Sequence, residues 1–238
     1  MQAFLVLLKY DIVQMARSWI VQVWVGLLVI AAGFLVGVAA SNTESASETM
    51  ALYMYAIFAP LSWLAVSIFA ASAISGEAEV VADSILSKSV NRTEYLSAKV
   101  VSRVGTTLVV YVLVVLPFAY MLSQYTVADT TGLGMTSGLL MVGAMFAFLP
   151  ALGILLSTVF RNVQLAILAV MAAVLFSGAL LQFLGLPWMS TTAVLNGLPA
   201  TFRGEVSLGT TLRVVVVFLS LTAAAIASSL WLYRQKDL

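Results

Sequence analysis

The chain contains no cysteine and no histidine, and only 9% of its 238 residues are charged. These absences exclude disulfides, thiolate nucleophiles, histidine proton relays and the commonest zinc ligand sets. The net charge is +1 and the basic residues are scattered, so there is no basic stripe for a nucleic acid. Hydrophobic residues make up 62% of the chain, whereas soluble domains have about 45–50%. The composition therefore indicates an integral membrane protein in contact with a lipid bilayer.

Six uncharged runs are long enough to cross, as helices, a hydrocarbon core about 30 Å thick. No Asp, Glu, Lys or Arg lies within any of them, and each would cost about 2.5–3.5 kcal/mol at the bilayer centre. The predicted fold is an all-α integral membrane protein, with one transmembrane domain over residues 1–238. The predicted spans are about 19–40, 51–74, 104–125, 135–160, 163–186 and 214–233.

The basic residues indicate the orientation of these spans. Only Arg203 and Arg213 lie on the side opposite the N-terminus. Nine of the eleven basic residues share the side of the N-terminus, namely Lys9, Arg17, Lys88, Arg92, Lys99, Arg103, Arg161, Arg234 and Lys236. Because cytoplasmic loops carry the excess of Lys and Arg, we expect a multi-pass protein of the cell membrane with both termini in the cytoplasm.

The first 18 residues precede the first span and have a helical pattern of their own. Apolar side chains recur at helical spacing at Phe4, Leu5, Leu8, Ile12, Met15 and Ala16. The other side of this helix holds Tyr10, Asp11, Gln14 and Arg17. The pattern predicts a helix in the inner membrane interface over residues 1–18, although an extension of the first span fits the same spacing.

In two further segments, the positions of glycine or proline indicate local structure. Gly33 and Gly37 form a GxxxG pair in the first span, which is typical of close helix packing, although glycine is common in membrane helices generally. Residues 187–211 form the longest loop on the outer side and contain Pro187, Gly197 and Pro199. This loop predicts short helical pieces at the outer interface or re-entering it, while a plain apolar loop on the helix ends fits equally well.

Charge is concentrated between the second and third spans. Within residues 76–87 the apolar positions follow helical spacing, whereas Glu77, Glu79 and Asp83 project elsewhere, which predicts a short amphipathic helix. Asn91 and Glu94 then form a variant of the capping box, so a second helix should begin at Arg92 and continue into the third span. This geometry suits a docking surface for a cytoplasmic partner. A solvated hairpin whose charges only fix topology is the simpler alternative.

These features resemble the permease subunits of ABC-2-type transporters. The resemblance is carried by the six-span layout, the amphipathic N-terminal helix and the stretch "SGEAEVVADSILSKSVNRTEYLSAKVV". The positions that match the family pattern are Glu77 and Glu79, Leu86 and Ser87, Arg92, and Lys99. Val90 departs from the pattern, because proline is common there in the family.

The resemblance implies an assembly of two permeases and two ATPases, in which residues 76–87 form a coupling helix that docks on the ATPase. The second permease is either a copy of this chain or a paralogue. The loop 187–211 would match the family's re-entrant helices, and the substrate would pass between the permeases. Tyr53, Tyr55 and Trp63 of the second span are candidate pathway residues. The ATPase-docking candidates are Glu77, Glu79, Asp83, Leu86, Ser87, Arg92 and Lys99.

The chain lacks the GxxxxGK[ST] sequence of a P-loop, so ATP hydrolysis is expected from a separate subunit and no cofactor is expected here. An ion-driven carrier is disfavoured because the predicted spans hold no ionisable acid or base. An intramembrane enzyme is disfavoured because nothing is available to activate its hydroxyls. The sequence thus predicts a permease that exports an unidentified substrate. A membrane scaffold that docks a partner without transport is the alternative.

Overall fold

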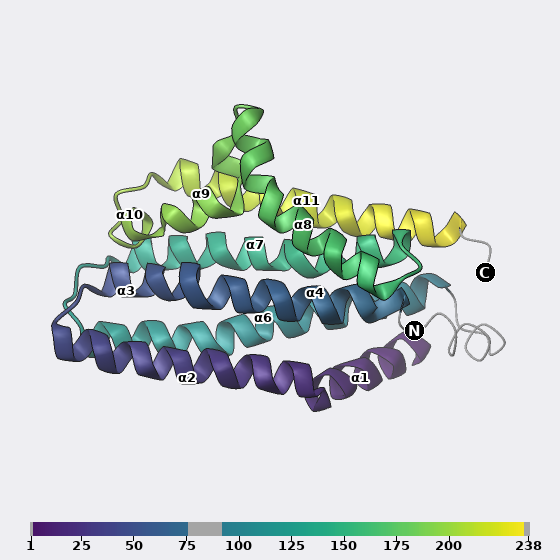
Figure 1. Ribbon diagram of the computed structural model, residues 1–238, viewed down its shortest axis with the longest axis horizontal. Helices are drawn as coiled ribbons and strands as arrows, with labels where there is room; N and C mark the ends of the chain where they lie inside the picture. Colours follow the sequence, from purple (N-terminus) through teal and green to yellow (C-terminus); the bar gives the residue numbers. More distant parts are fainter. Residues whose placement is uncertain (1, 76–91, 236–238) are drawn as a thin grey trace.

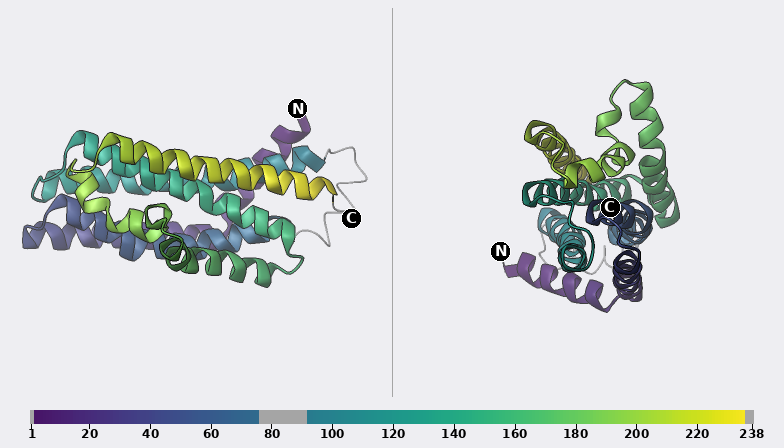
Figure 2. Two further views of the ribbon diagram at one scale, coloured as in Figure 1. Left: turned by 90° about the horizontal axis from the view of Figure 1, so that it is seen from above. Right: turned by 90° about the vertical axis from the view of Figure 1, so that its left-hand side faces the viewer.

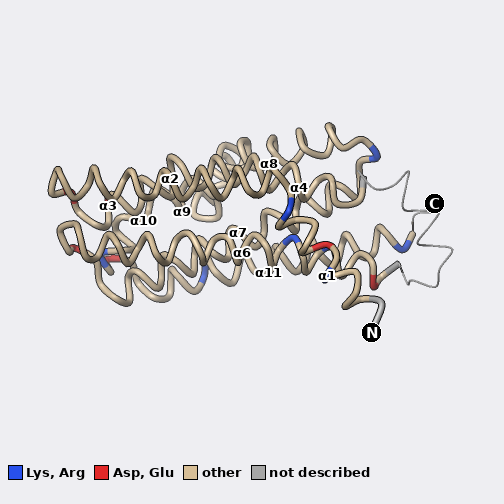
Figure 3. The backbone as a smooth tube through the Cα atoms, turned by 90° about the horizontal axis from the view of Figure 1, so that it is seen from below, with Lys and Arg blue, Asp and Glu red and all other residues tan. Residues whose placement is uncertain are grey.

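The computed structural model describes residues 2–75 and 92–235, and the regular elements in this part are helices. Six of them are long and apolar enough to cross a membrane, and they run along the longest axis of the molecule (Figure 1). The all-α membrane fold predicted from the uncharged runs is confirmed. Toward the two ends of the bundle lie most of the charged residues of the described part (Figure 3).

The spans form in chain order, with short helices between some of them. Span one is α2 (Trp19–Asn42), preceded by α1 (Gln2–Arg17). Span two is continuous through α3 (Ala46–Leu52), the π-helix η1 (Tyr53–Phe58) and α4 (Ala59–Ser75). The remaining spans are α6 (Arg92–Tyr125), α7 (Gly132–Val159), α8 (Val163–Phe183) and α11 (Leu208–Gln235). Between α8 and α11 lie η2 (Pro187–Met189), α9 (Thr191–Asn196) and α10 (Leu198–Phe202).

Several helices start or stop away from the predicted limits for local reasons. The helix α8 stops at Phe183 because Gly185 takes a left-handed backbone with φ +73° and Pro187 follows. The helix α11 starts at Leu208, within the predicted outer loop 187–211. In span two the π-helix ends at Phe58, two residues before Pro60, which lacks the N–H that a regular α-helix needs there.

The helix α7 lies at the centre of the bundle and packs against α4, α6, α8, α10 and α11 (Figures 1 and 2). Small residues allow these close approaches. A Cβ atom added at Gly153 would lie 2.6 Å from the Cβ of Ala70 on α4. Close backbone approach through small residues is the usual way in which membrane helices pack.

Aromatic side chains fill the core between η1, α6 and α7. Phe58 packs edge-on against Phe146 with ring centroids 4.9 Å apart, and Tyr53 lies 4.3 Å from Phe118. The polar tips are also paired, since the Tyr53 hydroxyl donates to the Leu28 carbonyl at 3.1 Å. Buried hydroxyls need such partners because leaving them unpaired costs about 1–3 kcal/mol.

At the end of the bundle opposite α1, two interhelical turns and α10 are joined in what we call the distal cap. The Ala46 N–H donates to the Val127 carbonyl at 3.1 Å, and the Val127 N–H donates to the Glu44 carbonyl at 3.0 Å. Asp129 accepts from the Ser47 N–H at 2.8 Å and from its hydroxyl. The Thr131 N–H donates to the carbonyl of Phe202 at 3.1 Å. The cap therefore ties the α2–α3 turn and the α6–α7 turn to each other and to α10.

Arg203 and Glu205 form an ion pair beside the distal cap. The Arg203 Nε lies 2.7 Å from the Glu205 Oε1. The hydrogen bond from Arg203 holds the pKa of the Glu205 carboxyl below its usual value. Because this ion pair is exposed, it contributes little to the stability of the protein.

Candidate functional site

The predicted coupling helix, residues 76–87, lies outside the described residues. Glu77, Glu79, Asp83, Leu86 and Ser87 fall within residues 76–91. The structure does describe the two helices that hold this segment, α4 ending at Ser75 and α6 beginning at Arg92. Both ends lie on the same side of the bundle as α1 and the α7–α8 turn (Figure 1). The coupling helix and its docking role remain predictions.

The helix α6 continues from this segment without interruption. It is a single helix of 34 residues from Arg92 to Tyr125, and Pro117 lies inside it without ending it. The predicted continuation of this helix into the third span is confirmed. Arg92 is the first residue described after the gap, so the helix start there stays a prediction. The first turns are held by packing, because Leu96 is fully buried beside Ala73 of α4 and Ile154 of α7. Tyr95 stacks on Tyr233 of α11 with centroids 6.3 Å apart.

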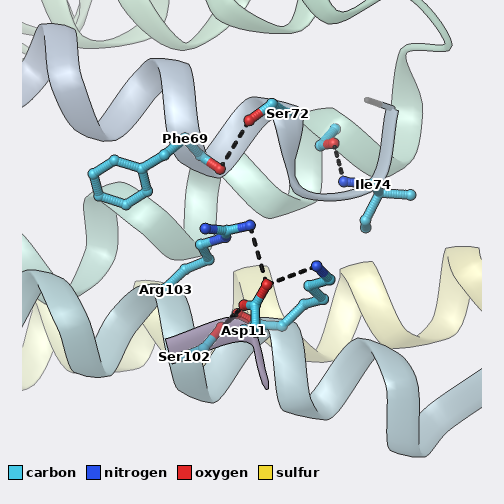
Figure 4. A network of polar contacts seen from close by, with 8 residues as sticks. Asp11, Phe69, Ser72, Ile74, Ser102 and Arg103 are labelled. Carbon is cyan, nitrogen blue, oxygen red and sulfur yellow. Dashed lines mark hydrogen bonds and ion pairs between the residues drawn. The ribbon is translucent and has the colours of Figure 1, made fainter. Parts of the chain in front are cut away.

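A buried cluster of charges joins α1 to α6, and we call it the Asp11 cluster (Figure 4). The Lys99 Nζ lies 2.7 Å from the Asp11 Oδ1, and the Arg103 Nη2 lies 3.4 Å from the same oxygen. The hydroxyl of Ser102 donates to the other carboxylate oxygen. Asp11, Lys99 and Arg103 are 2%, 5% and 8% exposed. A buried carboxylate with this number of donors is well satisfied, which offsets its loss of hydration.

The burial of Asp11 corrects the sequence interpretation of α1. The helical pattern placed Asp11 with Tyr10, Gln14 and Arg17 on a polar face directed away from the apolar side. Tyr10 is indeed 67% exposed, but Asp11 is buried. The reason is that α6 presents Lys99 and Ser102 opposite it. Viewed along the bundle, α1 lies across the helix axes rather than parallel to them (Figure 2, right).

The structure therefore places Lys99, one of the predicted docking residues, inside the chain. Its ammonium contacts α1 through Asp11 and lies 5.6 Å from the centre of the Tyr95 ring. Asp11 was not among the candidate site residues. One signal could have identified it, since it is the only acidic residue before Glu44.

The three candidate pathway residues do not come together. Tyr53 is fully buried in the aromatic core, whereas Tyr55 is 47% exposed on the outer surface of the bundle. Trp63 lines an apolar cavity of about 380 Å³. Of the three, Trp63 is the one that lines this cavity.

This apolar cavity lies between spans two, four, five and six. Phe148 and Leu149 of α7, Val174 of α8 and Phe218 of α11 contribute to its wall together with Trp63. Ser177 and Thr191 are its only hydroxyl-bearing lining residues. Ligand pockets typically have about 300–1,000 Å³ and mostly apolar walls, so this cavity has the size and chemistry of a small hydrophobic site. Sequence reasoning missed it because its wall is assembled from four distant segments.

Gly33 and Gly37 lie on an uncovered face of α2. A Cβ atom added at either position would meet no other atom within 4 Å. The buried face of α2 is formed instead by residues such as Trp24 and Leu28. The GxxxG pair therefore packs on no helix of its own chain within the described part.

A comparison with protein-family models identifies the class of this bundle. The model described as ABC-2 type transporter matches residues 2–208, which is most of the chain. The chain belongs to the ABC-2 type transporter family. This ABC-2 protein is thus a permease component of an ABC transporter, the multi-pass membrane part rather than the ATPase. A search of curated proteins found no match.

Membership of the ABC-2 family gives the described elements a context. The family implies an ATPase partner and commonly a pair of membrane subunits. In the ABC-2 permease described here, the matched region runs from α1 to the first residue of α11. It includes the helices on both sides of residues 76–91, the Asp11 cluster and most of the apolar cavity.

Proposed function

We propose that this permease couples a cytoplasmic ATPase to export through a pathway formed with a second permease, either a copy of this chain or a paralogue. The ATPase docks on residues 76–87, with Glu77, Glu79 and Asp83 setting the register and Leu86 seating on an apolar surface. The observation that supports this proposal best is α6, one unbroken helix from the docking segment to the distal cap.

The contacts of the first turns of α6 would allow a displacement to pass from the docking segment into the bundle. Leu96 and Val100 pack against α4 and α7, while Lys99 and Arg103 join α6 to α1 through Asp11. A displacement applied at residues 76–91 would therefore move α1 and the start of α6 together. Packed helices transmit such displacements as rigid-body shifts because cores do not deform continuously.

The cargo that suits this permease is hydrophobic or neutral. The predicted spans contain no charged residue that could pair with an ionic substrate within the bilayer. Trp63 borders the apolar cavity, which supplies one apolar surface along span two. Gly33 and Gly37 provide an uncovered small-residue face on α2 for contact with the second permease.

The proposal can be tested on the permease purified from its native membranes with the ATPase that accompanies it. We expect the triple reversal Glu77→Lys, Glu79→Lys and Asp83→Lys to reduce co-purified ATP hydrolysis at least about tenfold, because like charges at an interface cost several kcal/mol. The control is the double reversal Glu44→Lys and Glu48→Lys near the distal cap, which should leave ATP hydrolysis unchanged.

Two results would contradict the coupling proposal. One is full ATPase association and activity in the triple reversal. The other is an ATPase that stays bound but whose hydrolysis is unaffected by the permease, which would favour the scaffold alternative. A scaffold needs only a docking surface, whereas a transporter needs the docking surface and the catalytic cycle to be linked.

A further inference from the structure

A second cavity lies beside the Asp11 cluster, where α1, α2, α4 and α6 meet. It has a volume of about 250 Å³, and its polar lining consists of Gln14, Ser18, Ser72 and Arg103. We call it the Arg103 pocket. No acidic residue lines it. Gln14 lies on the exposed side of α1, so the pocket is open at its rim.

Arg103 is buried in this pocket with most of its donors unused. A guanidinium carries five N–H donors, and the contact to Asp11 uses only one nitrogen, at 3.4 Å. The Nε is buried and has no hydrogen-bond partner in the described part of the chain. The guanidinium lies between Asp11 on one side and Phe69 and Ser72 of α4 on the other (Figure 4). A buried unpaired donor of this kind indicates a missing acceptor.

Positive charge also gathers beside this pocket. Arg103 lines it, and its ion pair with Asp11 has an N–O distance of 3.4 Å. Arg17 adds another positive charge in the neighbouring cavity, which it lines with Gln14 and Ser18. Two guanidinium groups beside a pocket without an acidic lining residue favour an anionic ligand.

The start of α2 adds donors on the same wall. Ser18 is the N-cap residue of α2, but its side chain makes no capping hydrogen bond. Ile20 and Val21, in the first turn of α2, also line the pocket. The N–H groups of a first helical turn have no partner within the helix and favour negative charge. The hydroxyl of Ser18 is available as a further donor to the same ligand.

We propose that the Arg103 pocket binds a phosphate group. Arg103 would donate to it through its planar guanidinium, which matches phosphate oxygens, while Ser18 and the α2 N-terminus donate from other directions. Ser72 lines the pocket, but its hydroxyl already donates to the Phe69 carbonyl at 3.2 Å. A phosphate suits donors that converge from several sides because its oxygens point in several directions. The phosphate could belong to an anionic phospholipid, since the pocket lies where α1 crosses the ends of the spans, or it could be free phosphate. The proposal is independent of ATPase coupling.

The experiment uses the full-length permease, purified in mild detergent and stripped of lipid. Thermal unfolding is followed while dioleoylphosphatidylglycerol, dioleoylphosphatidylcholine or inorganic phosphate is added. We expect phosphatidylglycerol to raise the unfolding temperature at lower concentrations than phosphatidylcholine, whose choline group is repelled by Arg17 and Arg103. Stabilisation by the lipid alone assigns a lipid phosphate, whereas equal stabilisation by inorganic phosphate assigns free phosphate.

Three variants locate the effect. Arg103→Gln removes the guanidinium and should raise the half-saturating ligand concentration at least about tenfold. Ser72→Leu fills the pocket without changing a residue of the Asp11 ion pairs, and it should also raise the half-saturating ligand concentration at least about tenfold. It therefore tests the pocket even if Arg103→Gln does not fold. Arg161→Gln is the control, because Arg161 is an exposed cation at the same end of the bundle.

The inference is overturned by either of two results. The first is that Ser72→Leu and a folded Arg103→Gln bind the stabilising ligand as tightly as the unaltered protein. The second is that neither phosphatidylglycerol nor inorganic phosphate stabilises the permease more than phosphatidylcholine or chloride at the same concentration.

Discussion

Asp11 shows how one side chain determines where a whole helix lies. Without it, α1 would present its apolar side to the membrane and have no polar reason to touch α6. With it, a carboxylate that is 2% exposed accepts from Lys99 and Ser102 and fixes the crossing of the two helices. Buried ion pairs of this kind contribute more to a unique arrangement than to net stability.

Replacing Asp11 by Asn tests this role. The substitution keeps the size of the side chain but removes the carboxylate that pairs with Arg103 and that joins Lys99 to α1. Breaking a buried pair by removing one partner costs about 3–5 kcal/mol. The unfolding temperature of the purified permease should fall by several degrees, as measured by thermal unfolding in detergent. The exposed acid Glu48 serves as the control, and an equal fall in Glu48→Gln would contradict the assignment.

Gly134 is a residue where even a methyl group has no room. An added Cβ would lie 2.4 Å from the Phe202 carbonyl oxygen and 2.7 Å from the Gly204 nitrogen, and these backbone atoms cannot rotate away. Gly134→Ala should therefore loosen α10 from α7 and destabilise the protein by about 1–3 kcal/mol. Gly26→Ala is the matched control, because a Cβ there meets nothing within 4 Å. Thermal unfolding should separate the two, and equal stability would show that the cap shifts without cost.

Among the elements, α6 was the most predictable from sequence and α1 the least. The capping pattern at Asn91 and Glu94 predicts a helix from Arg92, and no helix breaker intervenes between there and the apolar run. The course of α1 was not predictable, because periodicity separates polar from apolar faces but does not say which neighbour covers each face. The same limit applies to the apolar cavity, whose wall depends on how α4, α7, α8 and α11 are arranged.

The continuity of α6 leads to a prediction that rests on the proposed function. Ser97→Pro would remove one helical hydrogen bond and clash with the carbonyl one turn earlier, which breaks or kinks the helix at a cost of about 3 kcal/mol or more. In the assembled transporter, an Ala128→Cys variant should report ATP-dependent changes at the distal end of α6 through its rate of maleimide labelling. Adding Ser97→Pro should abolish that ATP dependence while the ATPase stays bound, whereas Ser97→Ala should preserve it. An unchanged ATP response in the Ser97→Pro protein would refute the proposal that the continuous helix α6 transmits the displacement.

For the whole molecule, hydropathy was sufficient to predict the number of spans but not their packing order. Six apolar runs require six crossings because each charge in the bilayer is costly. Which helix occupies the centre depends on small residues such as Gly153. Its role becomes visible only in the structure, where it allows α7 to approach Ala70 of α4 closely. Sequence also did not reveal that span two contains a π-helix, since that choice depends on neighbours as well as on Pro60.

The orientation of the molecule can be tested directly because the chain contains no cysteine. A single Lys88→Cys variant should react with a membrane-impermeant maleimide only after the cells are permeabilised, since the positive-inside rule places Lys88 in the cytoplasm. Ala128→Cys, on the opposite side, should react in intact cells. Labelling of Lys88→Cys in intact cells would invert the topology and remove the basis for cytoplasmic docking.

The distal cap has a consequence for how such a bundle could ever open at that end. The backbone hydrogen bond between Ala46 and Val127 joins the α2–α3 turn to the α6–α7 turn. The four helix ends at these turns must then move as a unit, because separating them would leave backbone N–H and C=O groups without hydrogen-bond partners. Of the six spans, α8 has the smallest share of buried residues in its most apolar window, at 17%. Among the spans, α8 is therefore the one that the described helices cover least.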